Sequence, residues 1–191
     1  MTGELVALNG SPRLLDETGL RRTVSRLAHE VAEHHADTGR VVLVGIHTRG
    51  VPLALRLADT IARFERARPR VVAVDPRDFR DDRPRRPLGD AAVLSGVDGA
   101  TAPPINDADV ILVDDVLFTG RTQRAALDAL LTAGRPAVVE MLVLVDRGHR
   151  ELPLRATYVG KNVPTSSAER VAVRLREVDG VDGVWLQGTP S

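Results

Sequence analysis

The sequence contains no cysteine, which excludes a disulfide scaffold, a thiolate metal site and a cysteine nucleophile. It has no apolar run near the roughly 20 residues that a membrane-spanning helix needs. Its opening residues also lack the pattern of a secretory signal. We therefore expect a cytoplasmic protein without a membrane partner.

Net charge is absent as well, since 26 Lys and Arg residues balance 26 Asp and Glu residues. No global basic field can hold nucleic acid, so any nucleic-acid binding needs a local basic patch. Lysine itself is scarce, because Lys161 is the only one in the chain. The 191 residues, 43% of them apolar, suffice for one sizeable core, and we expect a single domain over residues 1–191.

Four short apolar runs rich in β-branched residues have the pattern of strands buried on both faces. They are residues 41–46, 70–75, 109–114 and 138–146. Amphipathic stretches predict helices between them, over residues 52–66 and 120–133. Strands that alternate with helices at this spacing predict an α/β fold with a parallel sheet, in which ligands bind at the carboxyl ends of the strands.

A further helix is predicted near the start of the chain, from Glu17 to Glu33, with Asp16 as its cap. One face carries an apolar stripe and the opposite face is polar. The stripe is Leu20, Val24, Leu27, Ala28 and Val31, and the polar face holds Arg22, Ser25, Arg26 and His29. At the end of the helix, His34 and His35 are expected to be exposed rather than to bind a metal, because the sequence spaces no third ligand to join them.

Two regions do not follow the regular alternation. Residues 76–108 are rich in charge, glycine and proline, and a connection of this length is typical of a lid, a binding loop or disorder. After residue 150, LRATYVG, VAVRLREV and GVWLQ predict short strands that extend the sheet or form a small subdomain.

The most informative segment is Val110–Thr122, with the sequence VILVDDVLFTGRT. Its apolar strand delivers Asp114 and Asp115 to a carboxyl end, and a Thr-Gly-Arg-Thr turn then opens a helix. Amides and hydroxyls at a helix N-terminus bind phosphate, and paired carboxylates accept hydrogen bonds from vicinal sugar hydroxyls. The segment therefore predicts a site for a phosphorylated sugar.

A bland alternative is a polar strand-to-helix turn with no ligand. We favour a site, because two acids at the end of a buried strand are costly unless they serve a function. The sequence contains neither G-x-x-x-x-G-K-[ST] nor G-x-G-x-x-G, so nucleotide kinases and dinucleotide dehydrogenases are weak candidates.

VILVDDVLFTGRT resembles the phosphoribosyl-pyrophosphate (PRPP) motif of type I phosphoribosyltransferases over its whole length. Gly45–Gly50, GIHTRG, resembles the pyrophosphate loop of the same family. This resemblance implies a central, mostly parallel sheet flanked by helices, a mobile loop and a small C-terminal base-binding extension. It also implies PRPP as substrate, with Mg²⁺ carried by PRPP and no direct metal site in the protein.

The resemblance assigns roles to residues of both loops. Arg49, Asp114 and Asp115 are the implied catalytic residues, with Arg49 at the pyrophosphate and the two acids at the ribose. The 5′-phosphate is expected at Thr119 through Thr122. The residues implied to bind PRPP or UMP are Thr48, Arg49, Gly50, Asp114, Asp115, Val116, Leu117, Phe118, Thr119, Gly120, Arg121 and Thr122.

RRTVSRLAHE, DRGHRELP and YVGKN together resemble one subgroup, the PyrR group of bifunctional pyrimidine-operon regulators and uracil phosphoribosyltransferases. The likeness runs from about residue 14 to 178 and is weakest over 83–108. It implies synthesis of UMP from uracil and PRPP, UMP-dependent binding to leader mRNA with attenuation of transcription, and a homo-oligomer, either a dimer or a tetramer.

The same resemblance implies three further sets of residues. Arg147, Tyr158, Val159 and Lys161 are the base-binding set, with the backbone of Val159 reading the polar edge of the base. The mobile loop would carry Phe79, Arg80, Asp81 and Asp82. The RNA-binding surface would comprise Ser25, Arg26, His29, His149, Arg150 and Arg155.

Some alternatives stay open at this point. Tyr158 is as well explained as a half-buried packing aromatic, and the polar helix face is also explained by exposure to solvent alone. Thr165 stands where purine enzymes of the family carry an acid, which argues against a purine. The chain could still be a phosphoribosyltransferase for another base without RNA binding, or a nucleotide-sensing regulator with negligible catalysis.

Overall fold

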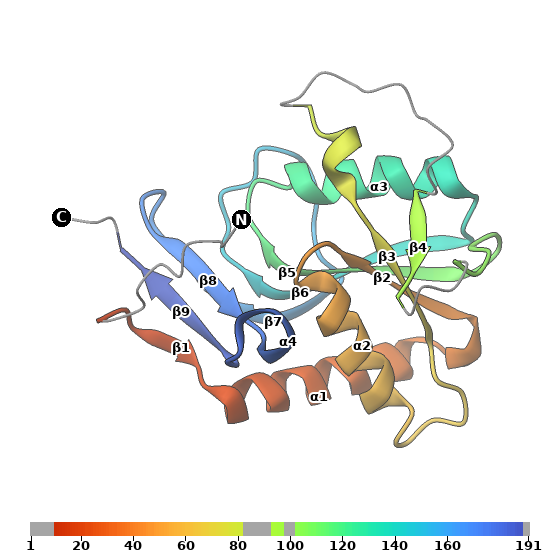
Figure 1. Cartoon of the computed structure of the whole chain (residues 1–191), viewed down its shortest axis with the longest axis horizontal. Helices are drawn as coiled ribbons and strands as arrows, with labels where there is room; N and C mark the ends of the chain where they lie inside the picture. Colours follow the sequence, from red (N-terminus) through yellow and green to blue (C-terminus); the bar gives the residue numbers. More distant parts are fainter. Residues whose placement is uncertain (1–9, 82–92, 98–101, 189–191) are drawn as a thin grey trace.

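A six-stranded sheet forms the centre of the molecule (Figure 1). The computed structural model describes residues 10–81, 93–97 and 102–188. The strand order is β4-β3-β2-β5-β6-β7, and all neighbours are parallel except the edge strand β4. The strands are β2 Val41–Ile46, β3 Arg70–Val74, β4 Leu94–Gly96, β5 Asp109–Leu117, β6 Val138–Asp146 and β7 Tyr158–Asn162.

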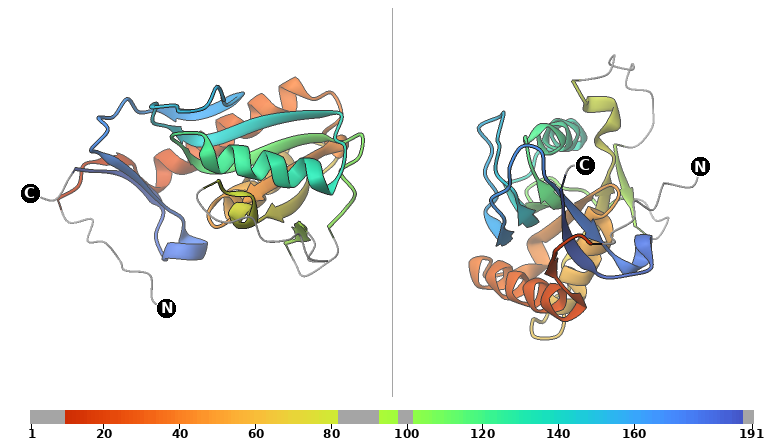
Figure 2. Two further views of the ribbon diagram at one scale, coloured as in Figure 1. Left: turned by 90° about the horizontal axis from the view of Figure 1, so that it is seen from above. Right: turned by 90° about the vertical axis from the view of Figure 1, so that its left-hand side faces the viewer.

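Helices cover both faces of this sheet, as the views in Figure 2 show. Helices α1 (Glu17–His34) and α2 (Gly50–Ile61) share one apolar core with the sheet. Helix α3 (Arg121–Ala133) packs on the opposite face. Two short 3-10 helices, η1 (Thr38–Arg40) and η2 (Pro76–Phe79), complete the connections. The predicted α/β fold with a mostly parallel sheet is confirmed.

Helix α1 begins and packs as predicted. The Asp16 side chain accepts a hydrogen bond from the Gly19 amide at 2.6 Å, which caps the N-terminus. The five residues of the predicted stripe are all buried. Burial of this face against α2 and the sheet holds the helix in place.

A second, smaller sheet lies apart from the first, on the left in Figure 1. It has the order β1-β9-β8, with β1 Arg13–Leu15, β8 Arg170–Arg174 and β9 Gly183–Gln187, all antiparallel. The one-turn helix α4 (Arg176–Asp179) joins β8 to β9. We call this sheet together with α4 the hood. Val173, Leu175 and Val184 of the hood belong to the core of α1 and α2, so the two sheets share one apolar cluster.

Several predicted boundaries were wrong. The helix expected over residues 52–66 begins at Gly50 and ends at Ile61, and Phe64, within the predicted range, is 41% exposed. Its apolar stripe is already complete at Ile61, and the chain then turns back toward β3. The strand expected over VAVRLREV ends at Arg174 and continues as α4. Strands β1 and β4 were not predicted.

The expectation that both histidines at the end of α1 are exposed was wrong for His35. Its side chain is buried, and its Nε2 atom lies 2.9 Å from a carboxylate oxygen of Glu140. Asp109 lies on the other side of the ring, 3.6 Å from Nδ1. His34 is exposed as expected. The two acids come from neighbouring strands, and this long-range pairing explains why the local sequence did not reveal it.

Candidate active site

Two loops meet at the carboxyl ends of the neighbouring strands β2 and β5. Gly45 of β2 pairs with Val113 of β5, so the segment after β2 and the acids after Val113 lie side by side. Gly50, at the start of α2, packs directly on β5. A Cβ atom at this position would lie 2.2 Å from the carbonyl oxygen of Val113. Only glycine permits this approach, which brings the end of the first loop to the second.

The two adjacent acids occupy different surroundings. Asp114 is 7% exposed, and its carboxylate accepts hydrogen bonds from Gln123 Nε2 at 2.6 Å and from the Asp115 amide at 2.9 Å. Asp115 is half-buried, and one of its oxygens accepts from the Val116 amide at 2.9 Å. The carboxylate of Asp114 is therefore buried and hydrogen-bonded within the protein, whereas that of Asp115 is partly exposed to solvent.

Burial raises the pKa of Asp114 well above its ordinary value, and the neighbouring charge of Asp115 raises it further. Burial also raises the pKa of Asp115, while the positive charge of Arg49 acts in the opposite direction. Two carboxyl groups this close cannot ionise independently. As the pH falls, the first proton goes to Asp114, and Asp115 retains its negative charge beside Arg49.

The turn after β5 has the form of an anion site. Gly120 adopts a φ of 91°, a left-handed conformation that favours glycine, and α3 begins at the next residue. Thr119 Oγ1 accepts a hydrogen bond from the Arg121 amide at 3.4 Å. The other amides of the first turn have no acceptor within the helix, and they point out of its N-terminus together with the positive end of the helix dipole. This geometry suits a phosphate group.

The segment that follows β6 braces this turn. The Arg147 amide donates to the Leu117 carbonyl at 3.1 Å, and the Glu151 amide donates to the Thr119 carbonyl at 3.0 Å. The Arg150 guanidinium donates to the Phe118 carbonyl at 2.7 Å. Backbone carbonyls of the turn are thus engaged by the protein, while its amides face outward.

Arg147 is a buried arginine without an acid in its hydrogen bonds. It is 5% exposed, and its guanidinium lies 3.9 Å from the centre of the Phe118 ring. Its Nε donates to Thr165 Oγ1 at 3.1 Å and its Nη2 donates to the Ser166 carbonyl at 3.2 Å. Burial lowers the pKa of Arg147, and the charge of Arg170 lowers it further. Arg147 therefore lies against the candidate phosphate turn, through Phe118.

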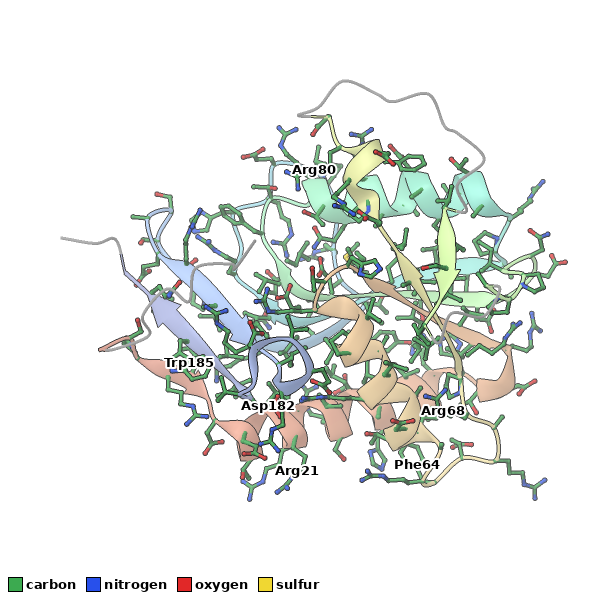
Figure 3. The ribbon with its side chains drawn as sticks, viewed as in Figure 1. Arg21, Phe64, Arg68, Arg80, Asp182 and Trp185 are labelled. Carbon is green, nitrogen blue, oxygen red and sulfur yellow. The ribbon has the colours of Figure 1, made fainter. Side chains whose placement is uncertain are left out.

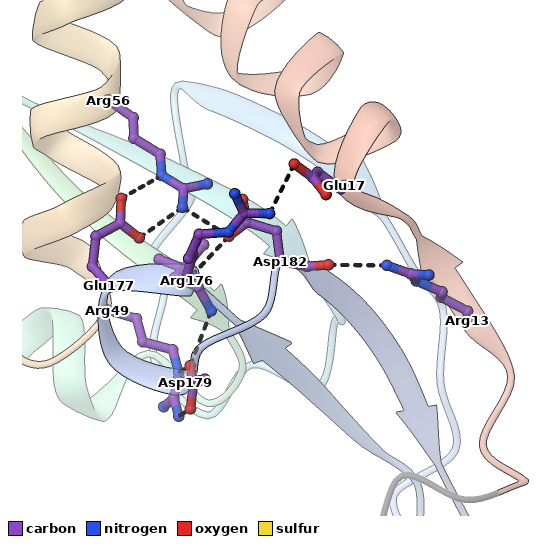
Figure 4. A network of polar contacts seen from close by, with 9 residues as sticks. Arg13, Glu17, Arg49, Arg56, Arg176, Glu177, Asp179 and Asp182 are labelled. Atoms are coloured by element: carbon purple, nitrogen blue, oxygen red, sulfur yellow. Dashed lines mark hydrogen bonds and ion pairs between the residues drawn. The ribbon is translucent and has the colours of Figure 1, made fainter.

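Arg49, at the end of the first loop, is bound by the hood. Its Nε and Nη2 atoms donate to the two carboxylate oxygens of Asp179, at 3.0 and 2.7 Å. Figure 4 shows this pair and the neighbouring contacts of Arg56 with Glu177 and Asp182. The candidate site consequently has two walls, the strand ends of the main sheet and helix α4 of the hood.

Comparison with known proteins identifies the family. Residues 12–175 match the family described as the phosphoribosyl transferase domain. The chain belongs to this family. Its curated relatives include proteins named Bifunctional protein PyrR from Roseiflexus sp. (strain RS-1), 52% identical over 94% of this chain and 97% of that protein, and from Bacillus subtilis (strain 168), 47% identical over 94% and 98%. The predicted resemblance to phosphoribosyltransferases and to the PyrR group is confirmed.

Solved structures of hypoxanthine phosphoribosyltransferases have the same fold. The enzyme of Trypanosoma cruzi gives a TM-score of 0.69 at 18% identity, covering 93% of this chain and 97% of that one. The enzyme of Staphylococcus aureus gives a TM-score of 0.66 at 18% identity, covering 98% of both chains. These comparisons show the type I phosphoribosyltransferase fold.

The start of the predicted mobile loop of this phosphoribosyltransferase reaches the PRPP motif. Phe79 ends η2 and packs on the core under α3, and Arg80 follows it. The Asp81 carboxylate lies 2.6 Å from Nη1 of Arg121. Asp82 lies outside the described residues. The ion pair joins the loop to the first residue of α3.

Two predicted base contacts are not where the prediction placed them. Tyr158 is 4% exposed in the core beneath α1, and its hydroxyl donates to Glu140 at 2.9 Å. The Val159 carbonyl accepts from Arg26 Nη2 at 3.0 Å, so α1 already occupies the acceptor that was predicted to read the base. Both are corrections, caused by the packing of α1 on β7. Lys161 is exposed on β7, opposite Val145 of β6 and toward the carboxyl end of the sheet.

The predicted RNA-binding residues on α1 divide between its two flanks. Arg26 points to β7, where it donates to the carbonyls of Val159 and Gly160 and pairs with Glu30. His29 points to the end of α2, where its ring stacks on Phe64 with centroids 4.2 Å apart. Ser25 is half-buried and lines a groove of about 480 Å³ between α1 and α2. His29 and Ser25 thus remain accessible together.

The predicted RNA-binding residues of the later segment also differ from one another. The guanidinium of Arg150 is already bound within the protein, because it pairs with Asp146 and donates to four backbone carbonyls. His149 is exposed, and its Nε2 lies 2.6 Å from the Thr165 carbonyl. Arg155 is exposed. Arg150 would contact RNA only at the expense of its bonds to the phosphate turn.

Sequence reasoning missed two residues that shape the site. Gln123 donates a hydrogen bond to Asp114. In the sequence, the one indication of this contact is the position of Gln123 in the first turn of the helix that follows the two acids. Asp179 binds Arg49 from 130 residues away, and no local pattern indicated it. Figure 3 shows the side chains of the described residues, with Asp182 labelled near α4 and Trp185 labelled on β9.

Two classes of site are not found in the part of the chain that the structure describes. No group of three or more His, Asp or Glu side chains there could hold a metal ion. No helix in residues 10–81, 93–97 or 102–188 is long and apolar enough to cross a membrane.

Proposed function

We propose that this chain is a uracil phosphoribosyltransferase of the PyrR type that also binds pyrimidine-operon leader mRNA in response to UMP. One observation carries the enzymatic half. The loop that ends in Gly50 packs on β5 directly beside Asp114, Asp115 and the anion turn, so sites for two phosphates flank a pair of acids. The relatives at about 50% identity that are named PyrR support the regulatory half.

The arrangement can hold PRPP in one orientation. The 5′-phosphate fits the amides and hydroxyls at the start of α3, where the helix dipole favours an anion. Asp115, with one oxygen not engaged by the backbone, is placed to accept from the ribose hydroxyls. We assign Arg49 to the pyrophosphate. The sugar therefore lies between the two loops, over the acid pair.

The reaction replaces one bond to the ribose with another. The bond from C1 to the pyrophosphate oxygen breaks, N1 of uracil bonds to C1, and the N1 proton passes to water. Positive charge builds on the ribose and negative charge on the pyrophosphate. Asp115 stabilises the first and Arg49 the second, from positions that folding has already fixed.

Mg²⁺ fits this site as a companion of the substrate. It prefers oxygen ligands, and among the described residues the carboxylates of Asp114 and Asp115 lie beside the proposed ribose position, with Asp114 engaged by Gln123. When bound to PRPP, Mg²⁺ neutralises charge on the departing pyrophosphate. The protein supplies the cradle, and the substrate supplies most of the remaining ligands.

Arg147 is our candidate for recognition of the base. Its guanidinium is buried against Phe118 of the PRPP motif and directs hydrogen bonds to neutral oxygens rather than to an acid. It can turn a donor toward a carbonyl oxygen of uracil. Lys161 lies on the adjacent edge strand as a second donor. Tyr158 and Val159 have no part in this proposal.

The enzymatic half is tested by UMP synthesis from uracil, PRPP and Mg²⁺. We expect turnover by the wild-type protein and a loss of about 10²-fold or more in kcat/KM for Asp115→Asn. Asp59→Asn, an exposed acid on α2 paired with Arg68, is the matched control and should retain activity. Hypoxanthine and guanine should not compete with uracil. A wild-type protein that forms no UMP would refute the enzymatic half.

The RNA-binding half is supported by one side of α1. Ser25 lines the groove between α1 and α2 together with Arg21, Arg22 and Arg63, and His29 stands beside it with its ring on Phe64. Arginines that bind phosphates and an accessible aromatic pair suit single-stranded RNA. The lining also includes Arg56 and the acids Glu17, Asp59 and Asp182, so four arginines face three acids and the groove has an excess of one positive charge.

Titration of leader RNA at several salt concentrations, with and without UMP, tests this half. We expect UMP to tighten binding and the logarithm of the affinity to fall linearly with the logarithm of the salt concentration. Equal affinity with and without UMP would contradict the switch. The resemblance further supports a cytoplasmic dimer or tetramer. Analytical ultracentrifugation would give the mass of the oligomer.

A further inference from the structure

Asp179 of the hood holds the guanidinium of Arg49 at two points. Nε of Arg49 lies 3.0 Å from one carboxylate oxygen, and Nη2 lies 2.7 Å from the other. A paired contact of this kind fixes the plane of the guanidinium as well as its position. Arg49 has no side-chain cap or other ion pair in the described residues, so this contact sets its orientation.

The position of Asp179 does not depend on Arg49. Its carboxylate also accepts from Arg174 Nη1 at 2.8 Å and from the Leu175 amide at 2.9 Å, and its side chain is only 5% exposed. Both of these donors belong to the hood. Asp179 is therefore a fixed point, and Arg49 is the partner that it orients.

One edge of Arg49 stays available. The contact with Asp179 uses Nε and Nη2, so Nη1 takes no part in it. Arg49 keeps 29% of its side chain exposed, and Asp115 is near enough to act on its charge. Arg49 is therefore partly exposed, close to Asp115, and has a donor left for the pyrophosphate that the proposed function assigns to it.

We propose that Asp179 is a positioning residue of the pyrophosphate subsite, and that the hood acts in the reaction by fixing Arg49 through this carboxylate. The inference rests on the proposed function, because it takes Arg49 to be the pyrophosphate ligand. A guanidinium that is already oriented loses little freedom when pyrophosphate binds or departs. Without Asp179, Arg49 must be ordered at the cost of affinity.

The inference predicts that loss of Asp179 weakens the binding of ligands that contain pyrophosphate and leaves the binding of other ligands unchanged. PRPP and inorganic pyrophosphate need an oriented Arg49, whereas UMP occupies only the phosphate turn, the ribose position and the base position. A general loss of structure would weaken all three ligands. A positioning role weakens PRPP and pyrophosphate alone.

The experiment compares Asp179→Asn and Asp179→Ala with wild-type protein, measuring KM for PRPP and for uracil, inhibition by pyrophosphate, and the affinity for UMP by calorimetry. We expect KM for PRPP and the inhibition constant for pyrophosphate to rise by about tenfold in Asp179→Ala. Asp179→Asn keeps the size and one acceptor, and should show a smaller rise. The UMP affinity and KM for uracil should stay within about twofold.

Glu177→Gln is the matched control, because Glu177 lies in the same turn but pairs with Arg56, which also contacts Asp182. It should leave both KM values unchanged. Equal weakening of PRPP and UMP, unchanged PRPP binding, or tighter PRPP binding in the Asp179 variants would each overturn the inference. Each of these outcomes is a difference between a variant and an active wild-type protein. They are therefore distinct from failure of the proposed function, in which the wild-type protein itself forms no UMP.

Discussion

At the scale of single residues, the candidate active site contains two adjacent acids that differ in burial and in hydrogen bonding. Asp114 lies behind Gln123 and is nearly inaccessible, while Asp115 is partly open beside Arg49. Holding a second carboxyl group in this buried position costs stability, since burial opposes its ionisation. The cost is understandable only if the pair serves the ligand.

We therefore expect Asp114→Asn to stabilise the fold at neutral pH. The pKa of Asp114 is raised in the folded protein, so ionisation disfavours folding at pH values above the ordinary aspartate pKa near 4 and has no effect well below it. A neutral amide removes this penalty, and Gln123 can rotate to bond with it. Thermal unfolding at pH 7 should show a rise of about 2–4 °C, the shift that about 1 kcal/mol gives in a protein of this size.

The gain should vanish in unfolding measurements near pH 3, where the wild-type carboxyl is protonated in both states. UMP synthesis should fall in the same variant. A lower melting temperature at pH 7 would show that the hydrogen bonds of Asp114 outweigh its burial. Asp59→Asn, at an exposed position, should change the melting temperature at neither pH.

Residues of the site were predictable where they are consecutive. Thr119, Gly120 and the two acids lie within one short segment, whose resemblance to a sugar-phosphate motif can be recognised from the sequence alone. Tyr158 shows the limit, because an aromatic residue in a strand can face either side of a sheet. Its burial under α1 follows from tertiary packing that the local sequence does not specify.

At the scale of elements, the start of α2 is set by a close approach of two backbones. Gly50 lies against the Val113 carbonyl of β5, and this contact places the first loop beside the acids. The four parallel strands of the βα units were predicted because strands buried on both faces have continuous apolar sequences. The ends of helices were less predictable, and α2 stops at Ile61 because the chain must return to β3.

Gly50→Ala should disturb both fold and function. Its Cβ would lie 2.2 Å from a backbone oxygen, so α2 or β5 must shift. We expect a loss of about 1–3 kcal/mol in the free energy of unfolding, together with weaker PRPP binding. Denaturant unfolding measures the first effect and KM for PRPP the second.

Gly188→Ala provides the matched control, since a Cβ there meets no atom within 4 Å. It should leave stability and KM unchanged. Equal behaviour of the two alanine variants would mean that the close contact between α2 and β5 does not constrain the loop.

At the scale of the whole molecule, two sheets enclose the site, and both apolar packing and ion pairs hold them together. The hood shares the core of α1 and α2, and its acids Asp179 and Asp182 bind Arg49 and Arg56 of the main domain (Figure 4). The sequence predicted short strands after residue 150. It could not predict that two of them leave the main sheet and pair with β1, because strand pairing across most of the chain has no local signal.

Docking of the hood should weaken in acid. Burial opposes ionisation of Asp179, but hydrogen bonds from Arg49 and Arg174 outweigh it and lower the pKa of Asp179 to about 2. A carboxyl whose folded pKa is lowered contributes stability above its unfolded pKa near 4, and this contribution is lost as the pH falls toward 2. Melting temperatures of wild type and Asp179→Asn should differ by a few degrees at pH 6 and converge near pH 2. A difference that persists at pH 2 would contradict an ionic origin.

The central claim is that the turn after β5 binds the phosphate of a nucleotide while the neighbouring acid binds its ribose. A crystal structure of the protein with UMP tests it most directly. We expect the phosphate at the amides and hydroxyls of Thr119–Thr122, the ribose hydroxyls within hydrogen-bond distance of Asp115, and the uracil ring near Arg147. UMP bound elsewhere, with Asp115 and Thr119 remote from it, would contradict the account.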